Sequence, residues 1–548
     1  MKRKIYSLMI AASMVFAASC DLDLQEDPNA VNASTANPDF LLNSIQLGYQ
    51  GVFNTIGDDG MRLTRMINQG SAQYEGAYTP TTTNGYWSNA YAGILADIDF
   101  LVPLAEESNL QRHLGIAKTI KAMVLFHLVD SYGDVPYREA LDPSNFFPNV
   151  DPGAQVYSDA LALLNEAEAH FNAPESSGSP NDFYYGRNYG KWTRLVNTMK
   201  LRYYLNTRLV NPSESATAIN ALIAGNNLLR EGDDFVFQFG TTSADPDSRH
   251  PRFTGTYVSG GGDYQSTYYM WHLTEAKGFD DPRVRYYIYR QTTVNSTDPD
   301  EIECIGTIPP AHYLANGFIY CLPGERGYWG RDHLNPDGIP PDGLRRSVWG
   351  VYPAGGRFDD DSAAPVNNIT LGAQGAGIHP IMLASYVDFM LAEAALFLGT
   401  TGDASAYLTS GIRKNMEFVR EFATSTPEAS TIRSFTSDDA YTQQVTNYVN
   451  YISNEYSSAS TDTDKMRIIG REYWLALYGN GVEAFNLYRR TGQPDNMQPG
   501  LQQNFGNFPR SFFYPLNYLT TNNNAVQKAD QTVQVFWDTN PAGNAWVY

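Results

Sequence analysis

The chain has 548 residues and a formal net charge of −21, from 38 basic and 59 acidic side chains. Such an acidic surface repels phosphate backbones, so the composition argues against a nucleic-acid partner. Aromatic residues make up 13% of the chain, with 37 tyrosines, whereas charged residues make up only 18%. Aromatic faces stack on the C–H faces of sugar rings while phenol and amide groups bond hydroxyls. Tyrosines also fill helical cores, and composition alone does not separate the two uses.

The first twenty residues indicate export. Lys2, Arg3 and Lys4 form a positive start, and residues 5–18 are apolar over a stretch shorter than the ~20 residues of a membrane span. The sequence that ends at Cys20 resembles a bacterial lipobox, which predicts that a signal peptide of residues 1–19 is removed and that Cys20 is lipidated. The alternative is an ordinary signal peptide with a coincidental cysteine. Because no later segment is long and apolar enough to span a bilayer, we expect a body held at a membrane only by a lipid anchor.

Asp-Pro and Asn-Pro steps predict a flexible tether over residues 20–37. Helical periodicity then dominates the chain. We expect helices near residues 87–102, 116–129, 154–171, 192–203, 381–398, 404–422, 440–452 and 464–478. Residues 232–378 are instead rich in Gly, Pro, Asp and aromatics, which predicts a loop-rich insertion. The pattern therefore predicts one mainly α-helical domain, residues 38–548, made of paired helices that carry this insertion.

The two remaining cysteines, Cys304 and Cys321, lie in the loop-rich part of the chain. In an exported protein they could form a disulfide, which would contribute on the order of 3 kcal/mol through chain entropy. Two separate buried thiols are the alternative, since spacing along the sequence does not place two Cβ atoms.

Several segments resemble one family in the order in which they occur. They are residues 130–140 (DSYGDVPYREA), Trp192 with residues 197–202 (NTMKLR), 391–394 (LAEA), 472–478 (EYWLALY), 483–485 (EAF), 489–494 (RRTGQP), 508–510 (FPR) and 514–515 (YP). This ordered set resembles the SusD/RagB-type nutrient-binding outer-membrane lipoproteins, and in particular the SusD-like subgroup. The middle of the chain is divergent, and residues 187–190 replace a common Gly-Asp pair, which leaves the ligand open.

The resemblance implies tetratricopeptide-like helix pairs with an irregular sub-domain inserted. It also implies a protein of the outer membrane, lipid-anchored and exposed on the cell surface, that captures oligosaccharides, or in some members peptides. Its partner would be a SusC-like TonB-dependent transporter, which it caps and supplies; the membrane would be contacted through the lipid anchor only. No cofactor and no metal is implied.

Turn and cap chemistry gives the recognisable motifs a structural interpretation. Asp134, followed by Val-Pro-Tyr, is expected to end the central helix and fix the next loop. Arg489 and Arg490 are expected to tie a helix end to carbonyls or carboxylates, for which a planar guanidinium is suited.

Aromatic residues are the candidate ligand contacts. The resemblance implies that a tryptophan near Trp87 contributes to sugar binding, although Trp87 also lies on an apolar helical stripe and could belong to the core. Tyr74 precedes it in a loop, and Trp271, Trp329 and Trp349 lie in the loop-rich insertion, where exposure is expected. Large aromatics are also what packs such an insertion, so each keeps a core interpretation.

Enzyme motifs are missing from the sequence. It contains no H-E-x-x-H, G-x-S-x-G or G-x-x-x-x-G-K-[ST]. Glu166 and His170 could share a helix face, but two ligands without a third are more typical of a solvated pair. The acidic run 359–361 lacks the spacing of a calcium loop. We therefore expect a non-catalytic binding protein, and keep a lipid-anchored glycan hydrolase and a helical scaffold for other envelope proteins as alternatives.

Overall fold

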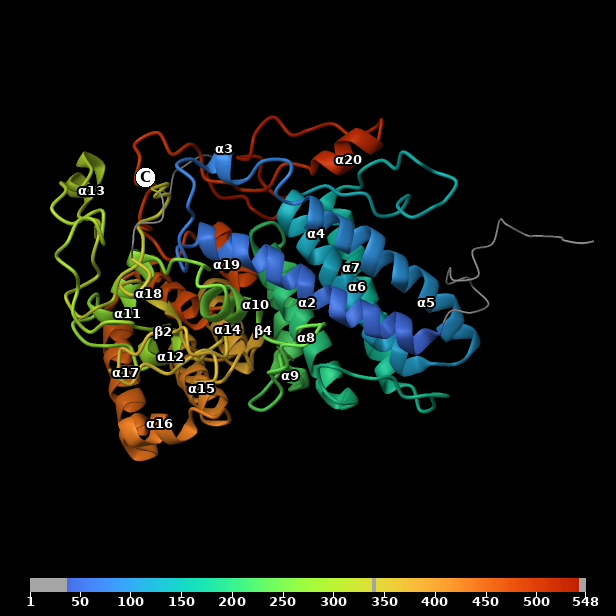
Figure 1. Cartoon of the computed structure of the whole chain (residues 1–548). Helices are drawn as coiled ribbons and strands as arrows, with labels where there is room; N and C mark the ends of the chain where they lie inside the picture. The colour runs from blue at the N-terminus through green and yellow to red at the C-terminus, as the bar shows by residue number, and fades with distance from the viewer. Residues whose placement is uncertain (1–36, 338–341, 542–548) are drawn as a thin grey trace, which may run out of the picture.

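The computed structural model describes residues 37–337 and 342–541 (Figure 1). Cys20, the predicted signal peptide and the tether up to residue 36 lie outside the described residues. The longer helices are α2 (Pro38–Leu63), α5 (Ala96–Glu107), α6 (Gln111–Tyr132), α7 (Gly153–Asn172), α8 (Tyr189–Asn206), α9 (Pro212–Gly225), α14 (Ala384–Leu398), α15 (Ala404–Thr424), α17 (Asp438–Ser458), α18 (Asp462–Ala476) and α19 (Gly481–Thr491). The fold is mainly α-helical, as predicted.

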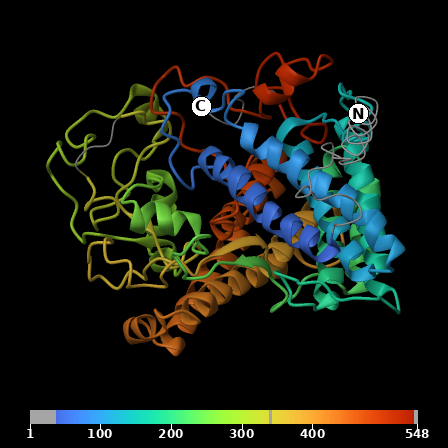
Figure 2. The same ribbon diagram turned by 45° about the vertical axis from the view of Figure 1, so that its right-hand side comes forward.

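Consecutive helices pack in pairs, which builds the scaffold. Helix α6 packs along α7 and α7 along α8, and in the second half of the chain α14 packs along α15 and α15 along α17. Figures 1 and 2 show helices α4 to α9 on one side of the molecule and the loop-rich part on the other. Among the described residues, no helix combines the length and the hydrophobicity needed to cross a bilayer.

Most helix boundaries follow local signals in the sequence. Helix α6 ends at Tyr132 because Gly133 has a φ of +79°, a conformation that costs glycine little. The side chains of Asp403, Ser437 and Thr461 cap the first turns of α15, α17 and α18. The expected helix over 87–102 is part of one continuous helical run made of α4 (Asn84–Ser88), η1 (Asn89–Leu95) and α5.

One prediction needs correction, and three of the longer helices (α2, α9 and α19) were not expected. The segment 381–398 does not begin as a helix, because β4 (Ile378–Met382) comes first and pairs with β1 (Phe235–Gln238) in an antiparallel ladder. Helix α2 was not expected, since four glycines (Gly48, Gly51, Gly57 and Gly60) weaken its helical pattern.

Gly60 of α2 and Gly481 of α19 have a packing role. A Cβ atom on Gly60 would lie 2.1 Å from the carbonyl oxygen of Gly481, and one on Gly481 would lie 2.0 Å from the carbonyl oxygen of Gly57. The backbones of α2 and α19 are therefore in direct contact, and the first described helix packs on a helix near the end of the chain.

In the described residues between β1 and β4, the chain forms only short elements. They are α10 (Pro251–Phe253), η3 (Thr254–Val258), α11 (Thr267–Thr274), α12 (Val284–Tyr287), α13 (Ala311–Asn316) and the antiparallel pair β2 (Ile288–Tyr289) and β3 (Val348–Trp349). The remaining short elements are α3 (Tyr74–Ala77), η2 (Thr207–Leu209), α16 (Ala429–Phe435) and α20 (Leu516–Thr521).

Candidate functional site

An open pocket of about 310 Å³ lies between α4, the loop that follows α6, and α20. We call it the Trp87 pocket; Trp87, Tyr91, Phe146 and Tyr518 are its aromatic lining residues, and Asp142 and Asn145 are among its polar ones. Trp87 is 7% exposed and forms part of the floor, whereas Phe146 is 78% exposed. The pocket therefore combines a deep aromatic base with a phenyl ring that is free to contact a ligand.

The floor is held by contacts between distant segments. The Trp87 ring lies 4.6 Å from Tyr91 and 4.7 Å from Tyr518, measured between centroids. The Tyr91 hydroxyl donates to the carbonyl of Pro136 at 2.7 Å. The Asn517 side chain donates to the Ser88 hydroxyl at 2.9 Å, which ties α20 to α4. The aromatic base is thus set before any ligand arrives.

The loop that carries Phe146 is held directly after that residue by the segment that follows α20. The side chain of Asn522 donates to the carbonyl of Pro148 at 2.8 Å, and that of Asn524 donates to the carbonyl of Phe147 at 2.7 Å. At the rim, hydrogen bonds from Ser144 lower the pKa of the Asp142 carboxyl, so this acceptor is ionised at neutral pH. Stacking on rings together with hydrogen bonds to hydroxyls is the chemistry that this arrangement supports.

The structure does not bring the other candidate aromatics to this pocket. Tyr74, Trp329 and Trp349 are buried with no ring face open to solvent. Trp271 of α11 is half-buried and stacks at 6.4 Å from Tyr268. A larger groove between α12, α16 and α17 contains none of the five predicted residues.

Each buried ring has identifiable interior partners. The Tyr74 hydroxyl bonds Arg65 and His333, both at 2.9 Å. The Trp349 indole donates to Asp263 at 3.2 Å, and the Arg252 guanidinium lies 4.5 Å from its ring centroid. In a region with few long helices, large aromatics supply the core.

Phe146 and Tyr518 were not singled out by the sequence. Tyr518 comes from a six-residue helix near the C-terminus, far along the chain from Trp87. One signal was available for Phe146, because it stands beside Phe147 in a polar loop bounded by Pro143 and Pro148. Adjacent apolar side chains in such a loop are unusual unless they contact a ligand or another part of the protein.

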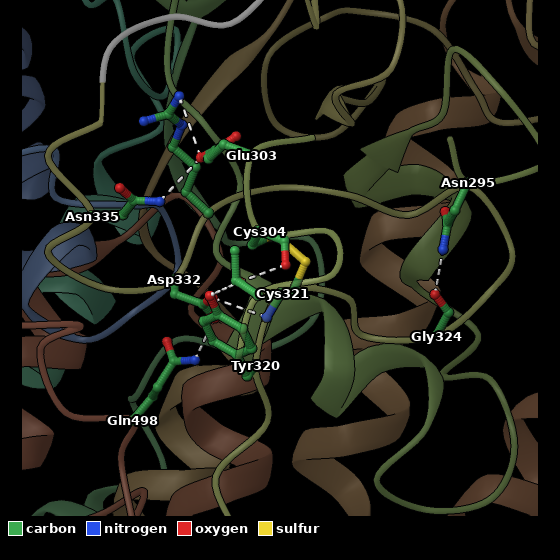
Figure 3. The surroundings of a disulfide bond; sticks show 11 residues. Asn295, Glu303, Cys304, Tyr320, Cys321, Gly324, Asp332, Asn335 and Gln498 are labelled. Atoms are coloured by element: carbon green, nitrogen blue, oxygen red, sulfur yellow. Dashed lines mark hydrogen bonds and ion pairs between the residues drawn. A yellow bond between two sulfur atoms is a disulfide. The ribbon is translucent and has the colours of Figure 1, made fainter. Parts of the chain in front are cut away.

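The structure joins Cys304 and Cys321 in a disulfide bond, with their Cα atoms 5.6 Å apart (Figure 3). The bond is packed with Ile302 and Trp329 in a small separate core. The backbone N–H of Cys321 donates to Asp332 at 2.9 Å, and the Gln498 side chain donates to the same carboxyl at 2.7 Å. Burial raises the pKa of Asp332 to about 6.

Glu393 and Arg490, two motif residues in the second half of the chain, form a buried ion-pair cluster with Arg208. The Glu393 carboxylate of α14 accepts from Arg490 of α19 at 2.7 and 2.8 Å. It also accepts from Arg208 of η2 at 2.8 Å. Burial opposes ionisation, but the guanidiniums of Arg490 and Arg208 outweigh it and hold the pKa of Glu393 below its ordinary value. We call this group the Glu393 cluster.

A second buried cluster surrounds Asp130, at the end of α6. Its carboxylate accepts from Arg202 at 2.7 Å and from the indole of Trp537 at 2.9 Å. Its backbone carbonyl accepts from Arg489 at 2.6 Å. Farther along, the Asp134 carboxylate accepts from the N–H of Gly153, the first residue of α7, at 2.8 Å. These motif residues join helices to one another and to the C-terminal segment.

The possible metal ligands have protein partners. Glu166 pairs with Lys118, and His170 bonds Gln111 at 2.7 Å. In the acidic run 359–361, Asp359 and Asp361 are ion-paired with Arg285 and Arg290. In residues 37–337 and 342–541, no group of three or more His, Cys, Asp or Glu side chains is arranged to hold a metal.

Two family models match the sequence of the chain. A family model described as "Starch-binding associating with outer membrane" matches residues 28–308. A second, described as "Susd and RagB outer membrane lipoprotein", matches residues 367–545. No curated protein sequence is significantly similar to the chain.

Solved structures match over almost the whole chain. A chitin-binding protein is 21% identical and superposes with a TM-score of 0.66, covering 92% of this chain and 100% of its own. A SusD homologue from Bacteroides fragilis is 19% identical with a TM-score of 0.65, covering 92% and 99%. A chitin-binding SusD homologue from Flavobacterium johnsoniae is 15% identical with a TM-score of 0.61, also covering 92% and 99%. These likenesses show a common fold, and because the first family model alone spans more than half of the sequence, the chain belongs to the SusD/RagB family.

Proposed function

We propose that the protein is a non-catalytic, lipid-anchored protein of the outer-membrane surface that captures oligosaccharides and delivers them to a SusC-like TonB-dependent transporter. The observation that carries this proposal is the Trp87 pocket, an open aromatic-floored hollow with an ionised acceptor at its rim, on a chain of the SusD/RagB family. Cys20 would carry the anchor.

The pocket suits sugar better than a strongly charged ligand. A pyranose ring offers C–H faces to Trp87 and Phe146, and its hydroxyls can donate to Asp142 and Asn145. An anionic ligand would approach a chain of net charge −21. The family description mentions starch, and two of the similar structures are named as chitin-binding, which supports a glycan as the first ligand class to test.

Binding is tested by calorimetric titration with maltoheptaose and chitohexaose. We expect Phe146→Ala to weaken binding about tenfold or more, because an exposed ring that stacks on a ligand is a typical energetic anchor. Phe40→Ala is the matched control, since Phe40 is 73% exposed at the start of α2 and lies outside the pocket. Equal affinities for both variants and the wild type would contradict the assignment of the pocket.

Partnership is tested by affinity purification of the tagged, natively lipidated protein from solubilised outer membranes, followed by mass spectrometry. Recovery of a large TonB-dependent barrel is the expected result. Recovery of an unrelated envelope protein alone would favour the scaffold alternative. Turnover of a glycan by the purified protein, abolished by a single carboxylate substitution, would favour the hydrolase alternative.

A further inference from the structure

A groove of about 600 Å³ lies between α12, α16 and α17, at the end of the molecule opposite to α20 (Figure 1). We call it the α17 groove. Its rim and walls include Phe279, Arg285, Phe435, Gln444, Asn447 and Tyr451. The volume falls within the ~300–1,000 Å³ typical of ligand pockets. No residue of the Trp87 pocket contributes to it.

Three aromatic rings of the groove are partly open to solvent. Phe279 is 37% exposed, Phe435 is 39% exposed and Tyr451 is 41% exposed. Phe279 and Tyr451 meet edge to face, with centroids 4.9 Å apart. Exposed rings that gather in one concave site are the feature expected of a ligand platform, whereas isolated surface aromatics need no explanation.

The floor beneath these rings is rigid and internally satisfied. The Tyr448 hydroxyl donates to Glu472 at 2.7 Å, and the Tyr441 hydroxyl donates to the carbonyl of Met416 at 2.8 Å. The Tyr286 hydroxyl accepts from Arg420 at 2.6 Å. Because the floor hydroxyls are already engaged, the floor contributes mainly ring surface to a ligand.

Polar contacts in the groove come from amides on one face of α17. Gln444, Asn447 and Tyr451 follow one another at intervals of three and four residues, so they share a helix face. The side-chain oxygen of Asn447 accepts from Gln443 at 2.8 Å, which leaves its amide nitrogen to donate outward. Within residues 37–337 and 342–541, the Gln444 amide has no hydrogen-bond partner. Amides beside aromatic faces match a ligand that presents hydroxyl or acetamido groups.

The charges around the groove are already paired. Arg285 bonds Asp361 at 2.9 Å and lies 4.4 Å from the Phe435 ring centroid. Asp280 is ion-paired with Arg326 at 2.7 Å, and Asp281 with Arg283 at 2.7 Å. A charged ligand would therefore find no unpaired counter-charge, and the charge balance fits a neutral one.

We propose that the α17 groove is a second binding site, for a segment of neutral oligosaccharide, on the opposite side of the molecule from the Trp87 pocket. The proposal rests on the proposed function in one respect, that the protein binds glycans. Two separate sites would let the protein hold one long oligosaccharide or two shorter ones at once. A long oligosaccharide bound at one site is present at a high effective concentration at the other, which strengthens its overall binding.

The test is calorimetric titration of the full chain with chitohexaose and maltoheptaose, with hydrogen exchange followed over residues 140–148 and 441–451. The wild type should bind at two sites and show protection of both segments. The double variant Phe279→Ala/Tyr451→Ala should lose one binding event, or weaken it about tenfold or more, together with the protection of 441–451. Both side chains are partly exposed, so the variant is expected to fold.

Asn447→Ala should weaken the same event, whereas Asn450→Ala, an exposed amide on α17 outside the groove, should not. Undiminished two-site binding by the double variant, or no protection of 441–451 in the wild type, would overturn the groove proposal and leave the Trp87 pocket intact. If the groove variant lost all binding while Phe146→Ala bound normally, the assignment of the Trp87 pocket as a binding site would be wrong and that of the α17 groove would stand. Failure of both probes to bind the wild type would overturn both assignments to a neutral glycan.

Discussion

The Glu393 cluster gives the sharpest stability prediction. Glu393→Gln keeps the size of the side chain but removes its charge, so two buried guanidiniums, those of Arg208 and Arg490, lose their shared counter-charge. All three side chains are buried. Removing one partner of a buried ion pair costs about 3–5 kcal/mol, because the remaining charge stays desolvated. Since domains are stable by only about 5–15 kcal/mol, this loss is a large fraction of the total stability.

The assay is urea denaturation followed by tryptophan fluorescence, with the disulfide intact. Glu393→Gln should move the midpoint to a clearly lower urea concentration. The control is Asp159→Asn, which breaks the surface pair between Asp159 and Arg138, whose side chains are 26% and 55% exposed. Such a pair is worth about 1 kcal/mol or less. If both variants lost the same small part of the free energy of unfolding, the idea that the motif acts through a buried charge cluster would be refuted.

Two further predictions concern pH and the disulfide. Burial, reinforced by Arg202, lowers the pKa of His127 to about 3, so between pH 6.5 and 3 the unfolded chain binds a proton that the folded chain does not. The free energy of unfolding should then fall by about 1.4 kcal/mol per pH unit as pH is lowered through this window. The measurement is the urea midpoint at pH 7, 5 and 4, and His127→Gln should make its dependence on pH less steep. Equal slopes for the variant and the wild type would contradict this. Replacing Cys304 and Cys321 with serine opens a loop of sequence separation 17 and should lower the free energy of unfolding by about 3 kcal/mol. Proteolysis between the two positions should also be faster than in the oxidised wild type.

The sequence predicted the helical architecture where local patterns decide it. Helix α6 is apolar on most sides and is followed by a glycine, so its existence and end could be inferred. Helix α2 could not, because the glycine at its C-terminal end, Gly60, is explained by the approach of α19, more than 400 residues later in the chain. Local propensity contains no information about such a partner.

The same limit applies to the candidate site. The sequence singled out Trp87, which lines the pocket, but Tyr518 reaches it only through the path of the C-terminal segment. Trp349 lies in a region that is irregular in sequence, yet Asp263 and Arg252 enclose it, and nothing in the spacing of these residues predicts their contact. Exposure of an aromatic side chain is a property of the tertiary structure, whereas loop composition indicates only that exposure is possible.

The contact between α2 and α19 also bears on how the chain acquires its structure. Since α2 leaves the ribosome before the other described helices and its backbone partner follows more than 400 residues later, the packing site of α2 is incomplete until nearly all of the chain is available. Closing so long a loop is slow relative to local helix pairing. The docking of α2 against α19 is therefore expected to be one of the last steps of folding, after the local helix pairs have formed.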